Sequence, residues 1–148
     1  MTIATKYTEL ADLGLTENDI EWLITQASMG ETDYTLEYSE QGSDWRMVAH
    51  DSAAEILAEQ FKCDLYCLGC FSAWFIADHL GIDTTAVEAM QAIDGFEALG
   101  QLIASSDLVG FAQKAVDADG IGHFFNLYDG SETEVYIDGK WFSVMRAN

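Results

Sequence analysis

Residues 33–50 read DYTLEYSEQGSDWRMVAH, and this stretch indicates that the chain contains β-structure as well as helix. In its first half apolar and polar side chains alternate, with Tyr34 and Leu36 on the same side of the backbone. A period of two residues is typical of a strand with one buried face. Residues 45–50 are again largely apolar, and residues 40–44 between the two halves are polar and contain a glycine. The pattern predicts a β-hairpin with an acidic loop.

Two helices are predicted before this hairpin. The first covers residues 5–13 and ends at Gly14, and the second begins at Thr16. Acidic side chains crowd the first turn of the second helix, where the helix dipole favours negative charge. The apolar side chains of the second helix recur at helical spacing and predict its buried stripe: Ile20, Leu23, Ile24 and Ala27.

After the hairpin, the sequence predicts one long central helix. Ser52 and Glu55 have the spacing of a capping box, a motif that marks a helix start. Helical character then continues to Gly81, and Gly69 is the one residue on the way that favours a break. Because residues 61–80 are apolar nearly all round, we expect this helix to be packed on several sides and buried.

The rest of the chain predicts shorter helices and then a small β-meander. Helices are expected from a second capping box at residues 85–88, and over residues 96–104 and 108–116. Strands are expected at residues 121–127, 133–137 and 140–145, with turns at the two Asp-Gly pairs 129–130 and 138–139. The fold class is therefore α+β, in which antiparallel hairpin and meander pieces, separate or joined in one sheet, pack against a buried central helix with additional helices.

The length of 148 residues favours a single globular domain over residues 1–148. Apolar residues make up 49% of the chain, which excludes disorder as the main state. The first 13 residues show no charged-then-apolar leader, and the three cysteines are an odd number within eight residues, so we expect a cytoplasmic, reduced protein. The uncharged stretch of residues 65–77 is too short for a membrane span.

Charge is the dominant property of the chain. With 26 Asp and Glu against 6 Lys and Arg, the net charge is −20 at pH 7, which excludes nucleic acid and anionic membranes as direct partners. A globule of this length is roughly 38 Å across, and duplex DNA of that length carries about 22 phosphates. The protein thus approaches the charge density of DNA, which favours binding to a basic nucleic-acid-binding protein. The alternative is that the carboxylates only solvate the surface, as in salt-adapted proteins.

The cysteines and histidines offer two metal-site hypotheses. Cys63, Cys67 and Cys70 have the spacing C-x3-C-x2-C, which resembles the cluster-binding signature of radical S-adenosylmethionine enzymes. Here the motif lies inside a predicted helix, where these positions form one stripe, so we interpret the cysteines as small buried core residues. A zinc site would combine them with a histidine, for which the candidates are His50, His79 and His123. His123 alternates with apolar neighbours and is expected to be half-buried.

Two carboxylate patterns could bind an ion. Asp117 and Asp119 begin a calcium-loop pattern, but Ile121 and Tyr128 occupy later ligand positions, so a helix end is the better interpretation. The C-terminal carboxylates could chelate a hard cation or act as paired acid and base, although turn geometry explains the Asp-Gly pairs. We predict no catalytic residue, no metal site and no cofactor.

Size, charge and two segments carry a resemblance to a known class of proteins. The segments are residues 68–82, LGCFSAWFIADHLGI, and residues 123–132, HFFNLYDGSE. In style the chain resembles the small acidic inhibitor proteins of phages and other mobile elements, including anti-restriction and anti-CRISPR proteins that imitate DNA. The resemblance implies an inhibitor without catalysis that binds a host defence nuclease or a CRISPR effector. That class shares no common fold or residue signature, so the resemblance assigns no functional residue.

The candidate partner-binding residues are acids at expected hairpin and turn positions. The first group lies on the polar side of the predicted hairpin and in its loop: Glu31, Asp33, Glu37, Glu40 and Asp44. The second group lies in the meander: Asp129, Glu132, Glu134 and Asp138. Each carboxylate would accept hydrogen bonds from arginine or lysine in place of a phosphate.

Two other functions stay open. The first is an acidic protein-interaction module or homodimer without mimicry, which would bind through apolar surface such as Trp141 and Phe142. The second is a small metal-dependent enzyme, which would retain bound metal on purification.

Overall fold

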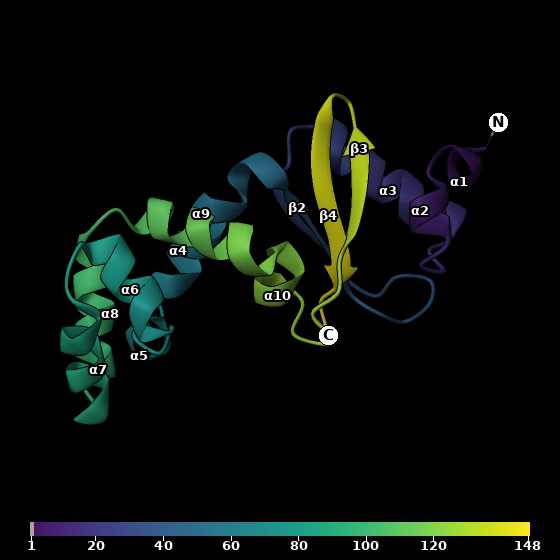
Figure 1. The fold of residues 1–148 in the computed structure, drawn as a ribbon. Helices are drawn as coiled ribbons and strands as arrows, with labels where there is room; N and C mark the ends of the chain where they lie inside the picture. Colours follow the sequence, from purple (N-terminus) through teal and green to yellow (C-terminus); the bar gives the residue numbers. More distant parts are fainter. Residues whose placement is uncertain (1) are drawn as a thin grey trace. The chain divides into compact units, whose positions relative to one another are not determined.

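The structure, a computed structural model, describes residues 2–148 and divides them into two compact units. The first unit combines the chain up to Ala53 with residues Val116–Asn148 and holds all the strands, so we call it the sheet unit. The second, residues Ala54–Ala115, is built from helices, and we call it the helical unit. Helices together with an antiparallel sheet confirm the α+β fold class (Figure 1).

One antiparallel sheet contains both predicted β pieces. Its strands are β1 (Asp33–Leu36), β2 (Trp45–Ala49), β3 (Thr133–Ile137) and β4 (Lys140–Arg146), in the order β1-β2-β4-β3. The hairpin and the meander join because β2 pairs with β4, with Trp45 opposite Arg146 and Ala49 opposite Phe142. The pairing leaves β1 and β3 at opposite edges of the sheet.

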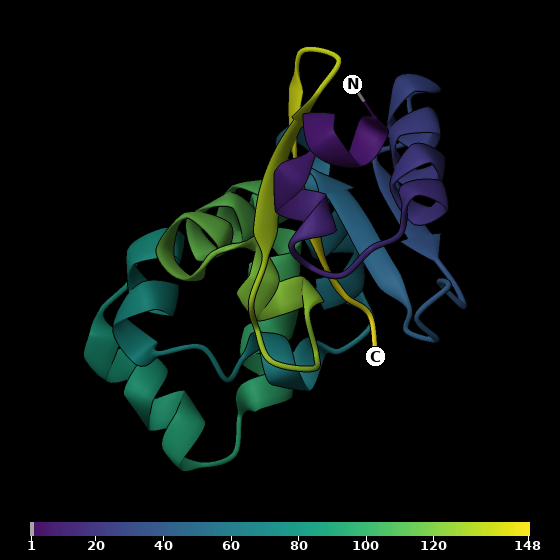
Figure 2. The ribbon, with the colours of Figure 1, turned by 90° about the vertical axis from the view of Figure 1, so that its right-hand side faces the viewer.

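Three helices near the N-terminus cover one face of the sheet: α1 (Ile3–Lys6), α2 (Thr8–Ala11) and α3 (Glu17–Ser28) (Figure 2). The helix predicted over residues 5–13 is wrong in extent, because Tyr7 leaves helical geometry at φ −119° and ψ 64° and separates α1 from α2. The α3 prediction is confirmed, since Ile20 and Leu23 are buried in the core and Thr16 forms a capping box with Asp19. These helices and alternate side chains of all four strands form the core of the sheet unit.

The strand predicted at residues 121–127 is wrong, because this segment forms the short helix α10 (Ile121–Phe125). Ile121 and Phe125 are both buried, and a spacing of four residues fits one face of a helix as well as alternate positions of a strand. Gly122 is buried, and a Cβ atom there would lie 2.5 Å from the carbonyl oxygen of Gly130, so the close packing of α10 requires a glycine. His123 lies on the exposed side of this helix and is not half-buried as predicted.

The prediction of a single central helix is also wrong. The segment forms the 3-10 turn η1 (His50–Ser52) and then three separate helices, α4 (Ala53–Lys62), α5 (Leu65–Leu68) and α6 (Ala73–Leu80). Asp64 breaks the chain between α4 and α5, because its carboxylate accepts a hydrogen bond from the backbone N–H of Cys67 and caps α5. The breaks expose parts of the segment, and Tyr66 and Trp74 are 48% and 64% exposed.

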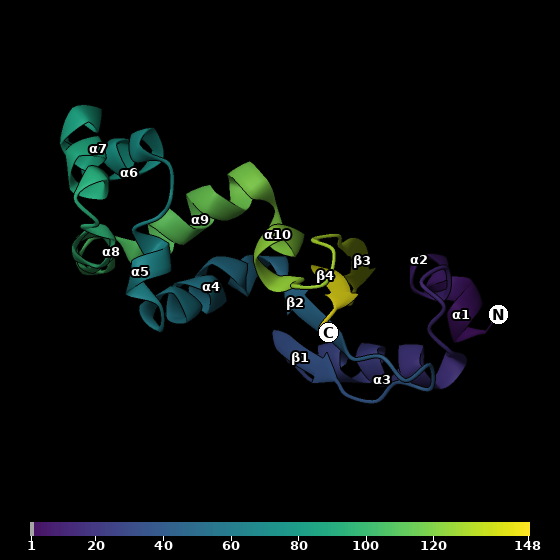
Figure 3. The same cartoon turned by 90° about the horizontal axis from the view of Figure 1, so that it is seen from below.

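The remaining helices of this region are α7 (Thr84–Ala92), α8 (Phe96–Ser105) and α9 (Leu108–Asp119). Figure 3 shows α5 beside α8 and α6 beside α7 in the helical unit. The α8 and α9 predictions are confirmed, and α9 ends at Asp119 as expected. The predicted start of α7 is wrong by two residues, because Asp83, not Thr85, is its N-cap.

Glycine permits the close contact between α5 and α8. A Cβ atom on Gly69 would lie 1.8 Å from the carbonyl oxygen of Phe96, and one on Gly100 would lie 1.9 Å from that of Leu65. The helical unit also contains a cluster of phenylalanine rings, in which Phe111 is buried and makes edge contacts with Phe61 and Phe71. Over residues 2–148, no helix combines the length and the apolar character needed to cross a membrane.

Candidate acidic interaction surface

The loop between β1 and β2 is braced by its own hydrogen bonds. The backbone N–H of Tyr38 donates to Asp44 Oδ1 over 2.8 Å, and the N–H of Ser39 donates to the carbonyl oxygen of Ser43 over 3.0 Å. Tyr38 has φ +54°, a left-handed conformation that ends the strand alternation two residues after Leu36. Strand β1 is therefore shorter than the alternation predicts, and the loop longer.

A side chain of helix α3 also binds this loop. Asp19, only 5% exposed, accepts a hydrogen bond from the backbone N–H of Glu40 with both carboxylate oxygens, each at 3.3 Å. Its other role is in the capping box of α3 with Thr16. A carboxylate that bonds both the loop and the helix start fixes the loop relative to α3.

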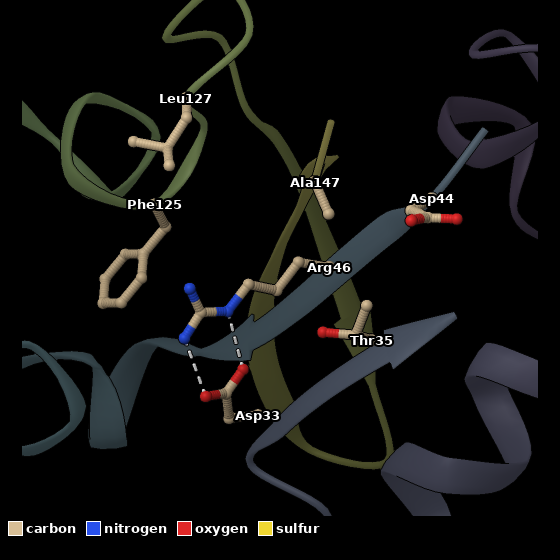
Figure 4. A pocket seen from close by; sticks show the side chains of 7 residues that line it. All are labelled: Asp33, Thr35, Asp44, Arg46, Phe125, Leu127 and Ala147. Atoms are coloured by element: carbon tan, nitrogen blue, oxygen red, sulfur yellow. Dashed lines mark hydrogen bonds and ion pairs between the residues drawn. The ribbon is translucent and has the colours of Figure 1, made fainter. Parts of the chain in front are cut away.

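Asp33 is neutralised within the hairpin. The guanidinium of Arg46 donates to Asp33 through Nε and through a terminal nitrogen, each over 2.8 Å, and lies 4.6 Å from the centre of the Phe125 ring. Figure 4 shows this two-bond pair in an open pocket that Thr35, Asp44 and Ala147 also line. Because Arg46 already occupies both oxygens of Asp33, this carboxylate is a poor candidate for contact with a partner.

Three other predicted residues of the first group keep their carboxylates available. Glu31, Glu37 and Glu40 are exposed, and no hydrogen bond or ion pair links their side chains to any residue in the described range 2–148. We call these three the hairpin carboxylates. They lie at or near the edge strand β1, within ten residues of sequence, and the stretch of residues 31–45 contains no lysine or arginine.

In the second predicted group, three of the four acids have intramolecular roles. Asp129 accepts bonds from the backbone and the hydroxyl of Ser131 and from Asn126, and the Ser131 bonds are the main cause that lowers the pKa of Asp129. Asp138 accepts a 2.6 Å hydrogen bond from Ser28, and Glu132 accepts one from Gly122. The fourth, Glu134, is exposed on β3 with no hydrogen bond or ion pair to the described residues.

The two predicted groups do not form one patch. The hairpin carboxylates belong to the β1 edge, whereas Glu134 belongs to β3 at the opposite edge.

Other acids cap helices, a role that the net charge alone does not reveal. Glu17 accepts hydrogen bonds from the first backbone N–H groups of α1, and Asp83 caps α7. Bonds to Thr85 lower the pKa of Asp83. An Asp directly before an apolar-periodic segment is the sequence signal for such caps.

The interpretation of the three cysteines as buried core residues is wrong. Cys63, Cys67 and Cys70 are free thiols and exposed, because the segment that carries them is not one buried helix. A hydrogen bond with Asp64 raises the pKa of the Cys67 thiol. Within residues 2–148, no cysteine belongs to a group of side chains whose potential ligand atoms converge as a metal site requires.

His79 is partly buried in the helical unit. Its Nε2 lies 2.9 Å from the hydroxyl of Ser106, its Nδ1 lies 3.4 Å from the ammonium of Lys114, and its ring makes an edge contact with Phe111. Burial first, and Lys114 second, lower the pKa of His79. This environment favours a neutral structural histidine.

Of the two residues predicted for an apolar contact surface, Phe142 is wrong and only Trp141 is exposed. Phe142 is 2% exposed and belongs to the core of the sheet unit, whereas Trp141 is 50% exposed. They are neighbours on β4, so their side chains point to opposite faces of the sheet.

In comparisons with protein-family models, curated proteins and solved structures, no family, relative or structural neighbour matches this chain.

Proposed function

We propose that this protein is a non-catalytic inhibitor that binds the basic, nucleic-acid-binding surface of another protein and competes there with nucleic acid. The observation that carries the proposal is the set of hairpin carboxylates, Glu31, Glu37 and Glu40, which are exposed, close in sequence and without a hydrogen bond or ion pair to residues 2–148, with Glu37 and Glu40 beside or in the braced loop. We place this activity in the cytoplasm.

Charge and rigidity both favour such binding. A net charge of −20 steers the protein toward cationic clefts and repels nucleic acid itself. Exposed ion pairs contribute only about 0.2–1 kcal/mol each, so several must act together. Because Asp19 and Asp44 already brace the loop, its backbone loses little conformational entropy when a partner binds Glu37 and Glu40.

The partner class follows from the chemistry that recognises carboxylates in place of phosphates. Arginine and lysine side chains that line a groove for DNA or RNA would donate to the hairpin carboxylates. Host defence nucleases and CRISPR effectors have such grooves, and the resemblance to anti-restriction and anti-CRISPR inhibitors favours this class. The protein would then be an anti-defence protein encoded by a phage or another mobile element.

The experiment begins with host proteins that bind DNA–cellulose. After nuclease treatment these proteins are passed over the immobilised inhibitor, and each retained protein is titrated with labelled duplex DNA in its absence and presence. We expect mutually exclusive binding that weakens as the salt concentration rises. A ternary complex of partner, DNA and this protein, or binding that is indifferent to salt, would contradict the proposal.

A second candidate function is an acidic interaction module or homodimer that binds through apolar surface. Trp141 and Tyr136 favour it, because they are 50% and 54% exposed and their rings lie 5.3 Å apart on neighbouring strands. Light scattering would show a dimer whose dissociation does not depend on salt, and Trp141→Ser would abolish the dimer while DNA competition persisted.

A further inference from the structure

Three side chains converge in the sheet unit: one of the candidate zinc-binding histidines and two acids of the second predicted group. His50 belongs to η1 directly after β2, Glu132 immediately precedes β3, and Glu134 lies within β3. One potential ligand atom from each lies within 4.8 Å of the other two. Glu132 and Glu134 are two residues apart along extended chain, which places both side chains on the same side of the backbone.

The strand register explains how His50 reaches the two glutamates. Strand β4 lies between β2 and β3, with Ala49 opposite Phe142 and Glu134 opposite Ser143. The continuation of β2 into η1 therefore brings His50 toward the same part of β4 that faces Glu134. Ser143 is fully buried at this point of β4.

Two of the three ligand side chains, His50 and Glu132, are held in place by hydrogen bonds. Glu132 accepts a 2.9 Å bond from the backbone N–H of Gly122 with Oε1, and a bond from the hydroxyl of Ser143 with Oε2. His50 Nε2 lies 2.8 Å from Ser143 Oγ. Because Ser143 has one hydroxyl proton and donates it to Glu132, His50 Nε2 donates to Ser143, and Nδ1 of the neutral ring keeps its lone pair. The Trp141 ring stacks against the imidazole of His50, with the two ring centres 6.5 Å apart.

We propose that His50, Glu132 and Glu134 bind a divalent transition-metal ion of the Zn²⁺ type. One imidazole nitrogen with two carboxylates is a donor set for Zn²⁺, whereas Ca²⁺ and Mg²⁺ prefer oxygen ligands throughout. Ligands at roughly 2.0–2.2 Å from one ion lie up to about 4.4 Å apart, so small side-chain rotations complete the site. The remaining coordination positions are open to water.

The surroundings of the three ligands match those of known metal sites. Neighbouring hydrogen bonds usually orient the ligand side chains of metal sites, and Ser143 bonds both His50 and Glu132. Glu134 has no competing partner in residues 2–148, and an ion there would offset the repulsion between two carboxylates on one face. None of the three ligands is a hairpin carboxylate, so this site stands independently of the proposed function.

Zinc titration tests the proposal in a background that removes thiol ligands. Because Cys63, Cys67 and Cys70 are exposed and would bind Zn²⁺ themselves, the parent is the variant with all three changed to serine. Calorimetry with Zn²⁺ in excess Mg²⁺, which occupies weak surface carboxylates, should show one ion per chain. His50→Gln and Glu134→Gln should each weaken binding at least about tenfold.

Matched controls separate the site from general charge and from unfolding. His123→Gln and Glu88→Gln remove the same groups at exposed positions, in α10 and α7, and should leave zinc affinity unchanged. Circular dichroism checks that each variant is folded, and Glu134→Gln is exposed enough to be tolerated. Absence of zinc binding in the triple-serine parent, or equal affinity in the site and control variants, would overturn the proposal.

Discussion

At the scale of single residues, many carboxylates that make up the net charge already bond within the protein. Asp19 and Asp44 brace the hairpin loop, Asp33 pairs with Arg46, and Asp83 caps α7. The sequence could place Glu37 and Glu40 in an acidic hairpin, because alternation and loop composition are local signals. It could not distinguish these free carboxylates from Asp33, because that difference depends on where the Arg46 side chain points.

His79 leads to a prediction about pH. Its folded-state pKa lies below the ordinary 6.5, first because of burial and then because of Lys114, against the opposite effects of Asp107 and Asp78. As the pH falls through about 6.5, the unfolded chain therefore binds more protons than the folded one, and the free energy of unfolding decreases. Urea unfolding at about pH 7.5 and 5.5 should show this loss.

The control variants identify the group responsible for that loss. His79→Gln, whose amide can still bond Ser106, should reduce the pH dependence, whereas His123→Gln at an exposed site should retain it. Asp83 and Asp129, whose pKa values are lowered, act in a more acidic window, below their ordinary 3.8. A wild-type pH dependence in His79→Gln would contradict this account.

At the scale of elements, close contact between helices depends on glycine. Gly69→Ala places a methyl group 1.8 Å from the backbone oxygen of Phe96, which cannot move without shifting α8. We expect a loss of about 1–3 kcal/mol in the free energy of unfolding, typical of overpacked interiors. Chemical denaturation followed by circular dichroism measures it.

Gly110→Ala is the matched control for that substitution. It also adds a methyl group to a helical glycine, but the nearest atoms belong to the side chain of Asp107, which is exposed. A shift of that side chain relieves the contact at the cost of its hydrogen bond from the backbone N–H of Gly110, and the higher helix propensity of alanine offsets part of this cost. Equal destabilisation by the two substitutions would show that the α5–α8 contact is not the cause.

The elements also show where sequence patterns are informative. The α3 stripe and strands β2, β3 and β4 follow from periodicity over several residues, and the structure confirms them. The spacing of four residues between Ile121 and Phe125 fits both periods, so the pattern predicts a strand where the structure has a helix. Periodicity predicts one helix for the central segment because it does not register the Asp64 cap of α5 or the bonds from Gln91 to the carbonyl oxygens of Gly69 and Phe71 before α6. The hairpin and the meander, which lie far apart in the sequence, join through the pairing of β2 with β4. Local sequence patterns do not predict this pairing.

At the scale of the whole molecule, the net charge of −20 leads to a prediction about salt. Repulsion among exposed carboxylates destabilises the folded chain, and mobile ions screen it. The melting temperature should therefore rise when NaCl increases from about 10 mM to about 200 mM, a range over which the screening length shortens severalfold. Differential scanning calorimetry measures the rise, and an equal concentration range of sucrose controls for solute effects. A melting temperature that does not respond to salt would contradict it.

The most direct test of the central claim compares two triple variants in a DNA-competition titration against a captured partner. Glu31, Glu37 and Glu40 changed to glutamine remove the hairpin carboxylates, and Glu55, Glu88 and Glu97 changed to glutamine remove the same charge from exposed positions of the helical unit. Three contacts of roughly 0.5 kcal/mol each predict inhibition about tenfold weaker in the hairpin variant and unchanged in the control. Equal inhibition by the two variants would contradict the account.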